Sequence, residues 1–332
     1  AALPAPFWRL HAAARLSAVG EKARPIACGD TIRRLFARTF CTDTRDRVSA
    51  LLEPIGQFGV GARGGAERVA LMAQLTHECG GVLLAIDGSN AFNALSRSAV
   101  LTAVAEHLPG LYGYVEHIYG PGRAPWLQFG LDGHADAAII LSQQGVQQGD
   151  PLGPLLFALA LRGTMVAARA KFPQLALPGY LDDLTIMTPS CDAPVLGHVG
   201  RAFCFIQQAL SELNIQVNVT KCAALVPASG GARERAAAVF AAANVPVPVC
   251  DDGITLMGVP VGTEGFVRAQ VAATLRAPGT DRLVAELVQM EDVQAAFSIL
   301  RLAVPARAGH VARNTAPSLT HEELRRFDAI TL

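Results

Sequence analysis

The sequence predicts a mixed fold in which short strands alternate with helices around a large apolar core. Of its 332 residues, 51% are hydrophobic and only 17% are charged, so the chain can bury a core instead of remaining disordered. Its length suits one large domain or two to three lobes that share a core. Apolar runs of strand length also alternate with longer segments of helical spacing.

The first clear strand and helix follow one another in the middle of the N-terminal half. The run from Gly81 to Asp87 is apolar up to its final carboxylate, which is typical of a buried strand that ends at a functional site. A helix is predicted from Ser96 to about Glu106, because its apolar residues have helical spacing and a serine is a favoured N-cap.

The next segments repeat this alternation. We expect a strand over Ala137–Leu141, a turn over Gln147–Pro151, and a long apolar helix that begins at Pro151 and runs to about Ala170. Two strands, Gln174–Tyr180 and Leu184–Thr188, are predicted to form a hairpin.

The C-terminal part of the chain continues with helices and shorter strands. An amphipathic helix is expected over Val195–Leu213, with short strands over Ala223–Val226 and Ile254–Met257. From Phe266 onward the pattern is mainly helical.

Composition excludes several classes of protein. Seven scattered cysteines without a Cys-x-x-Cys pair argue against a disulfide framework or a zinc module and suit a reducing interior. The longest uncharged run, Ala236–Cys250, is short and contains two prolines, so it is not expected to cross a bilayer. No leader peptide opens the sequence, and we expect an intracellular protein of the nucleus or cytoplasm. Because the chain begins at Ala1 without methionine, we expect it to be part of a longer protein.

Net charge is zero, yet its distribution is uneven. Residues 1–47 hold nine Lys and Arg against four acids, and arginine is the better bidentate ligand for phosphate. A GC-rich coding sequence would also raise the arginine content. Each of these arginines is therefore either a phosphate ligand or a consequence of that composition.

The most informative feature is the set of acids that end apolar strands. Asp87 closes one strand, and Asp182 and Asp183 form the tip of the predicted hairpin. Buried carboxylates are costly unless they are paired or hold a cation. Oxygen ligands from two strands suit Mg²⁺, which completes its shell with water and substrate phosphates. The alternative is that Asp87 caps a helix and that the two later acids form an ordinary turn.

Three segments resemble successive motifs of reverse transcriptases. Ala85–Asn93 resembles motif A, Gly145–Phe157 resembles motif B with its Gln-Gly-x-Pro-Leu pattern, and Tyr180–Asp183 resembles the Tyr-x-Asp-Asp of motif C. Their order and spacing match the family. Two positions depart from it: Gly153 stands where serine is usual, and Asn93 where an Asp often follows Ala-Phe.

Flanking segments extend the resemblance to residues 24–262. Residues 24–29 and 33–35 resemble the fingers motif of non-LTR retrotransposon polymerases, and residues 57–67 resemble the segment before motif A. Residues 218–221 resemble motif D, and residues 256–260 resemble motif E, the primer grip.

The resemblance implies roles for particular residues. Asp87 and Asp182 would bridge two Mg²⁺ ions, with Asp183 tuning the site. Lys221 would donate a proton to the leaving pyrophosphate or pair with its charge. The substrate-binding candidates are Phe92 as a gate against the 2′-hydroxyl, Gln148 and Gly149 beside the nucleotide and template, Tyr180 of motif C, and the fingers arginines Arg24, Arg33 and Arg34.

The resemblance also implies an architecture and an activity. We expect an α+β right-hand polymerase whose palm is an antiparallel sheet backed by helices. Fingers would cover residues 1–80 and 98–145, the palm residues 81–97 and 146–262, and a partial thumb residues 263–332. The expected function is RNA-directed DNA polymerisation with two Mg²⁺ ions, an RNA template, a DNA primer and dNTPs, within a longer retroelement polyprotein.

Two other functions share these features. A decayed or domesticated polymerase fold would bind nucleic acid without catalysis. An RNA-dependent RNA polymerase would share the metal site, but it predicts a Gly-Asp-Asp hairpin and a small or polar residue in place of Phe92, and the sequence has neither.

Overall fold

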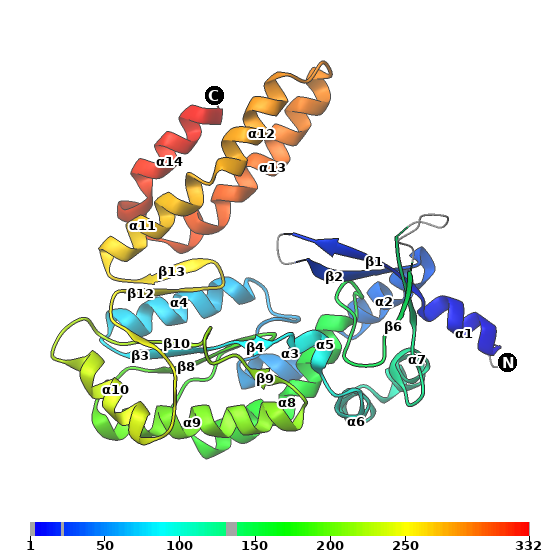
Figure 1. Cartoon of the computed structure of the whole chain (residues 1–332), viewed down its shortest axis with the longest axis horizontal. Helices are drawn as coiled ribbons and strands as arrows, with labels where there is room; N and C mark the ends of the chain where they lie inside the picture. The colour runs from blue at the N-terminus through cyan, green and yellow to red at the C-terminus, as the bar shows by residue number, and fades with distance from the viewer. Residues whose placement is uncertain (1–3, 21–22, 131–137, 332) are drawn as a thin grey trace. The chain divides into compact units, whose positions relative to one another are not determined.

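The computed structural model (Figure 1) describes residues 4–20, 23–130 and 138–331. The chain divides into two compact units. The first unit comprises Ala1–Gly65, Ile86–Ile186 and His198–Lys221. The second comprises Ala66–Ala85, Met187–Gly197 and Cys222–Leu332. Each unit is therefore assembled from segments that are distant in the sequence.

A four-stranded sheet forms part of the first unit. Its strand order is β2-β1-β5-β6, with β1 and β2 antiparallel, β1 and β5 parallel, and β5 and β6 antiparallel. The strands are β1 (Ala14–Val19), β2 (Arg24–Gly29), β5 (Trp126–Phe129) and β6 (Ala138–Leu141). The strand predicted over Ala137–Leu141 is thus present from Ala138, and Ala137 lies outside the described residues.

Helices make up most of the remainder of the first unit. They are α1 (Ala5–Ala12), α2 (Thr31–Asp43), α3 (Arg45–Leu52), the short 3₁₀ helix η1 (Glu53–Ile55), α5 (Ala91–Ala94), α6 (Arg97–His107), α7 (Pro109–Tyr119), α8 (Gly153–Lys171) and most of α9 (Ala193–Glu212). The predicted helix after Ser96 is confirmed, and the Ser96 hydroxyl caps it by accepting from the Ala99 amide.

The long apolar helix begins later than predicted. It starts at Gly153 and not at Pro151, because the Asp150 carboxylate accepts a hydrogen bond from the Leu152 amide and holds these residues in a turn. Pro154 instead occupies the first turn of α8, where a proline costs little.

The hairpin that carries the paired acids is also shorter than predicted. It consists of β7 (Gly179–Tyr180) and β8 (Asp183–Thr188), and no regular strand covers residues 174–178. Leu175 and Leu177 are buried without pairing as a strand. The two-residue spacing of these leucines therefore reflects the packing of an irregular segment against the core.

The end of β3 (Val82–Ile86) lies beside β8 in the sheet. Just beyond it, β4 (Gly88–Ser89) pairs antiparallel with β9 (Gln216–Val217). Asp87 is the residue between β3 and β4. It belongs to the first unit, as does the turn of the β7–β8 hairpin.

The second unit contains strands and a group of C-terminal helices. In it β10 pairs antiparallel with β3 and parallel with β11, while β12 and β13 form a hairpin. Its elements are α4 (Gly65–Glu78), β10 (Ala223–Leu225), α10 (Ala232–Ala242), β11 (Val249–Cys250), β12 (Gly253–Leu256), β13 (Val259–Gly262), α11 (Glu264–Leu275), α12 (Pro278–Val288), α13 (Val293–Asn314) and α14 (Pro317–Thr331).

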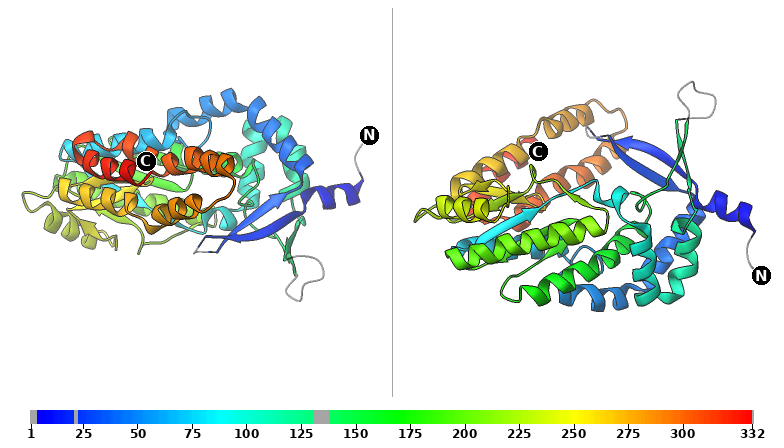
Figure 2. Two further views of the ribbon diagram at one scale, coloured as in Figure 1. Left: turned by 90° about the horizontal axis from the view of Figure 1, so that it is seen from above. Right: turned by 60° about the horizontal axis from the view of Figure 1, so that its bottom comes forward.

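Helices α11 to α14 gather around their own apolar cluster (Figure 2). Val271 and Val304 are almost fully buried in it, and Phe327 contributes an aromatic ring. The helical character predicted after Phe266 is confirmed. None of the helices in the described residues is both long and apolar enough to cross a membrane.

Candidate active site

Asp87, Asp182 and Asp183 line one cavity of about 730 Å³ in the first unit. Asp87 follows β3, and the other two lie at the tip of the β7–β8 hairpin. The remaining lining residues come from β2, from α5 and the segment before it, from the turn before α8 and the first turn of α8, and from the segment after β9. They are Arg24, Pro25, Gly88, Asn90, Ala91, Phe92, Gln147, Gln148, Gly149, Asp150, Pro154 and Lys221.

Backbone pairing fixes the position of Asp87. Its carbonyl oxygen accepts a hydrogen bond of 2.8 Å from the Asn218 amide, and Gly88 is opposite Val217 in the β4–β9 pair. This pairing brings Lys221 close, and its Nζ lies 3.8 Å from Asp87 Oδ1. Lys221 is more than half exposed, so its ammonium group can adjust to a ligand.

A buried amide holds the hairpin turn. Leu181 has a φ of +58°, which is unfavourable for a side chain of this type and requires support from its surroundings. Gln57, fully buried, accepts from the amides of Leu181 (2.8 Å) and Gly59 (3.0 Å) and donates to the Leu181 carbonyl (3.1 Å). Gln57 therefore fixes the backbone that presents Asp182 and Asp183.

The acids of the site repel one another. Burial raises the pKa of Asp182, and the nearby charge of Asp87 adds to that effect. Burial also raises the pKa of Asp183 to about 6, with further contributions from Asp182 and Asp87, although part of the side chain reaches solvent. The positive charge of Arg24 opposes both shifts. A further cation at this place would therefore be stabilised.

This repulsion predicts a pH dependence of stability. The pKa of Asp183 is about 6 in the folded protein, against an ordinary value of 3.8, so the folded state holds this proton more tightly than the unfolded state. The contribution of Asp183 to folding stability is therefore fully present below pH 3.8 and is lost as pH rises through about 6. We expect the melting temperature, measured without divalent cations, to fall more over this window in the wild type than in Asp183→Asn. Parallel curves for the two proteins would contradict the prediction.

The turn before α8 presents Gln148 and Gly149 to the same cavity. The Gln148 carbonyl accepts a hydrogen bond of 2.6 Å from the Ala27 amide of β2. Gly149 has a φ of +103°, and a Cβ there would lie 2.7 Å from the Ala27 carbonyl oxygen. Only glycine fits this close approach of two backbones.

Phe92 lies on the short helix α5 and also lines the cavity. Its ring stacks on Phe157 of α8, with centroids 4.5 Å apart and an angle of 11° between the planes. The stack holds the Phe92 ring in place at the wall of the cavity.

The remaining candidates lie outside the cavity lining. Arg34 is exposed on α2, and Tyr180 is opposite Asp183 in the hairpin register. Arg33 is 1% exposed, and its Nη2 lies 2.7 Å from Asp150 Oδ2. Of the three fingers arginines, the structure brings Arg24 alone to the cavity within its described residues.

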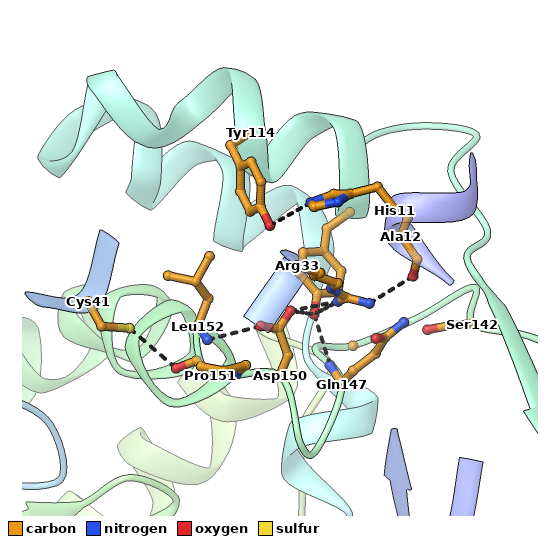
Figure 3. Close-up of polar contacts among 12 residues, drawn as sticks. His11, Ala12, Arg33, Cys41, Tyr114, Ser142, Gln147, Asp150, Pro151 and Leu152 are labelled. Atoms are coloured by element: carbon orange, nitrogen blue, oxygen red, sulfur yellow. Dashed lines mark hydrogen bonds and ion pairs between the residues drawn. The ribbon is translucent and has the colours of Figure 1, made fainter. Parts of the chain in front are cut away.

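The ion pair between Arg33 and Asp150 belongs to a buried network (Figure 3). Arg33 also donates to the Ala12 carbonyl at 2.8 Å, and the Tyr119 hydroxyl donates to Asp150 at 2.6 Å. Burial raises the pKa of Tyr119, so the hydroxyl keeps its proton. Sequence reasoning missed this network. Its one signal in the sequence was the acid Asp150 in the turn before the apolar helix α8.

The residues at the cavity fit a divalent cation. No three His, Cys, Asp or Glu side chains in the described ranges form a ready-made metal cage. Mg²⁺ does not require one, since it binds through one or two carboxylates and takes its other ligands from water and substrate phosphates. The oxygen donors of Asp87 and Asp182 are compatible with such an ion, and so is the raised pKa of Asp182, which burial and the nearby Asp87 charge produce.

A hairpin with paired aspartates, a third aspartate at the end of the neighbouring strand and a Gln-Gly turn together define a palm-type polymerase. The model of the family "Reverse transcriptase (RNA-dependent DNA polymerase)" matches residues 21–261, and the chain belongs to this family. The resemblance inferred from the motifs is confirmed. The retrotransposable element SLACS 132 kDa protein of Trypanosoma brucei gambiense is 35% identical over 136 residues, which are 40% of this chain and 11% of that protein.

Solved structures confirm the predicted polymerase fold. Apo telomerase from Candida tropicalis superposes with a TM-score of 0.53 at 11% identity, covering 97% of this chain and 57% of that one. A form truncated from the C-terminal domain gives a TM-score of 0.52 at 10% identity, covering 76% and 53%. This likeness concerns the fold alone.

Proposed function

We propose that this chain catalyses RNA-directed DNA synthesis, adding dNTPs to the 3′-hydroxyl of a primer. The observation that carries the proposal is the convergence of Asp87, Asp182 and Asp183 on one cavity with Gln148 and Gly149. These residues come from the three segments that resemble motifs A, B and C. The family to which the chain belongs supports the same activity.

Asp87 and Asp182 would hold two Mg²⁺ ions. Bound there, the ions would stabilise the charge on the attacking and leaving oxygens of the phosphoryl transfer. Other residues of the chain add negative charge near the ions and hold the aspartates in position. The carboxylate of Asp183 lies close enough to Asp182 and Asp87 to add to the negative charge of the pocket, which favours cation binding. Gln57 keeps the hairpin in the required conformation.

Arg24 and Lys221 are suited to the triphosphate. Both line the cavity and carry the positive charge that phosphate oxygens require. As the primer 3′-oxygen attacks the α-phosphorus, the bond to pyrophosphate breaks and negative charge develops on the leaving group. Lys221 can neutralise that charge or donate a proton to it.

Phe92 would exclude ribonucleotides by steric contact with the 2′-hydroxyl. Because the ring stacks on Phe157, moving it aside for a 2′-hydroxyl would cost the energy of that contact. We expect Phe92→Ala to lower the preference for dTTP over UTP by roughly a hundredfold, the upper range for discrimination by pocket shape. Single-nucleotide incorporation with each triphosphate measures the ratio. An unchanged ratio would assign the gate to another group.

The wider assignments follow from this function. We propose that residues 1–80 and 98–145 form fingers, residues 81–97 and 146–262 a palm, and residues 263–332 a partial thumb. An RNA template, a DNA primer and the other modules of a retroelement polyprotein would be its partners inside the cell. The similarity to the SLACS retrotransposable element protein supports that context.

The decisive experiment is primer extension on poly(rA)·oligo(dT) with Mg²⁺ and, in separate reactions, dTTP or UTP. Incorporation of dTTP is the expected result. If the folded protein binds primer–template but incorporates nothing, the chain is a nucleic-acid-binding module that has lost catalysis. If it extends only with UTP, it is an RNA polymerase.

A further inference from the structure

Gln147 is a buried polar residue at the cavity to which neither the motifs nor the proposed function gives a role. Its side chain is only 4% exposed, and it lines the same cavity as the aspartates. Neither Nε2 nor Oε1 of its carboxamide has a hydrogen-bond partner among the residues that the structure describes. Buried polar groups are nearly always paired in native proteins, so an unpaired amide at a binding cavity indicates a ligand contact.

The backbone of Gln147 is held on both sides. Its amide donates to the Tyr119 hydroxyl at 3.3 Å, and its carbonyl accepts from the Asp150 amide at 3.2 Å. The Tyr119 hydroxyl donates to Asp150, and Asp150 pairs with Arg33 in the buried network. Figure 3 labels Arg33, Gln147 and Asp150. Gln147 therefore starts from a fixed backbone, which lowers the entropic cost of binding through its side chain.

The preceding residues connect Gln147 to Phe92. The Val146 amide donates to the Phe92 carbonyl at 2.8 Å. Gly145 has a φ of +66° and lies so close to Asn93 that a Cβ would be 2.3 Å from its backbone. The segment that carries Gln147 is thus fixed against the helix that carries the proposed sugar gate.

Charge indicates which part of a nucleotide the amide contacts. The cationic groups at the cavity, Arg24 and Lys221, suit the triphosphate. Gln147 is neutral and can both donate and accept, which suits a hydroxyl or a base edge. We propose that the Gln147 carboxamide hydrogen-bonds the nucleoside part of the incoming dNTP. This inference rests on the proposed polymerase function.

The test compares Gln147→Met with Gln208→Met. Methionine has a similar length but lacks the amide, and Gln208 is an exposed residue of α9 outside the cavity lining. We expect Gln147→Met to raise the KM for dTTP roughly tenfold on poly(rA)·oligo(dT), the effect of losing one good hydrogen bond or two weak ones. The Kd for primer–template should stay within about twofold of wild type, and Gln208→Met should match wild type in both constants.

Thermal stability distinguishes this role from a structural one. Removing an unpaired buried amide should leave the ligand-free melting temperature of Gln147→Met equal to or higher than that of the wild type. A lower melting temperature, an unchanged KM for dTTP, or a change in primer–template affinity alone would each overturn the inference. Wild-type incorporation separates the two hypotheses: its absence overturns the proposed function, whereas an active wild type with an unaffected Gln147→Met overturns only this assignment.

Discussion

Asp182→Asn and Asp87→Asn are each expected to reduce primer extension at least about a thousandfold, which corresponds to about 4 kcal/mol of lost transition-state stabilisation. Asparagine keeps the shape of the side chain but removes the charge that holds a divalent cation. Primer–template affinity should change little, because cationic groups provide most of the contact with phosphates. Incorporation of labelled dTTP and a filter-binding assay measure the two quantities.

The matched control is Asp46→Asn, which alters an exposed acid in the first turn of α3. It should extend primers like the wild type. Asp183→Asn should have a smaller effect than either variant, since this residue is proposed to tune the site and not to bridge metals. Turnover preserved in Asp87→Asn or Asp182→Asn would reject the metal assignment.

Arg33→Met is expected to destabilise the folded protein by about 3–5 kcal/mol, the usual cost of removing one partner from a buried ion pair. Arg33 and Asp150 are both 1% exposed at their side chains. Without the guanidinium group, Asp150 would keep the Tyr119 hydroxyl and the Leu152 amide as partners, but its charge would be buried without compensation. Urea unfolding followed by circular dichroism measures the change.

Arg34→Met provides the control, because Arg34 is the exposed neighbour on the same helix and its loss should cost less than about 0.5 kcal/mol. The double variant Arg33→Met/Asp150→Leu should recover part of the stability, since it leaves no unpaired charge. Equal stabilities of Arg33→Met and Arg34→Met would show that the pair contributes nothing.

The three aspartates illustrate how far sequence reasoning reaches. Asp87 follows an apolar strand and Asp183 begins one, while Asp182 lies in the turn between β7 and β8. Such local patterns depend on neighbouring residues, so the strands around Asp87 and Asp183 were predictable. The lengths of the elements were less so. Leu175 and Leu177 alternate like strand residues yet pack in an irregular segment, and Asp150 delays the start of α8 through a side-chain hydrogen bond.

By itself the sequence determined the family, the order of the motifs and the acids that converge on one cavity, because these depend on local patterns that persist along the chain. Only the tertiary structure separated Arg24, at the cavity, from Arg33, which is buried against Asp150. The same holds for the side chains of Gln57 and Gln147. Gln57 binds Leu181, which is more than a hundred residues away, and the side-chain carboxamide of Gln147 has no hydrogen-bond partner within the described protein. Which polar group is paired inside a core depends on distant segments meeting in space, and no local pattern records it.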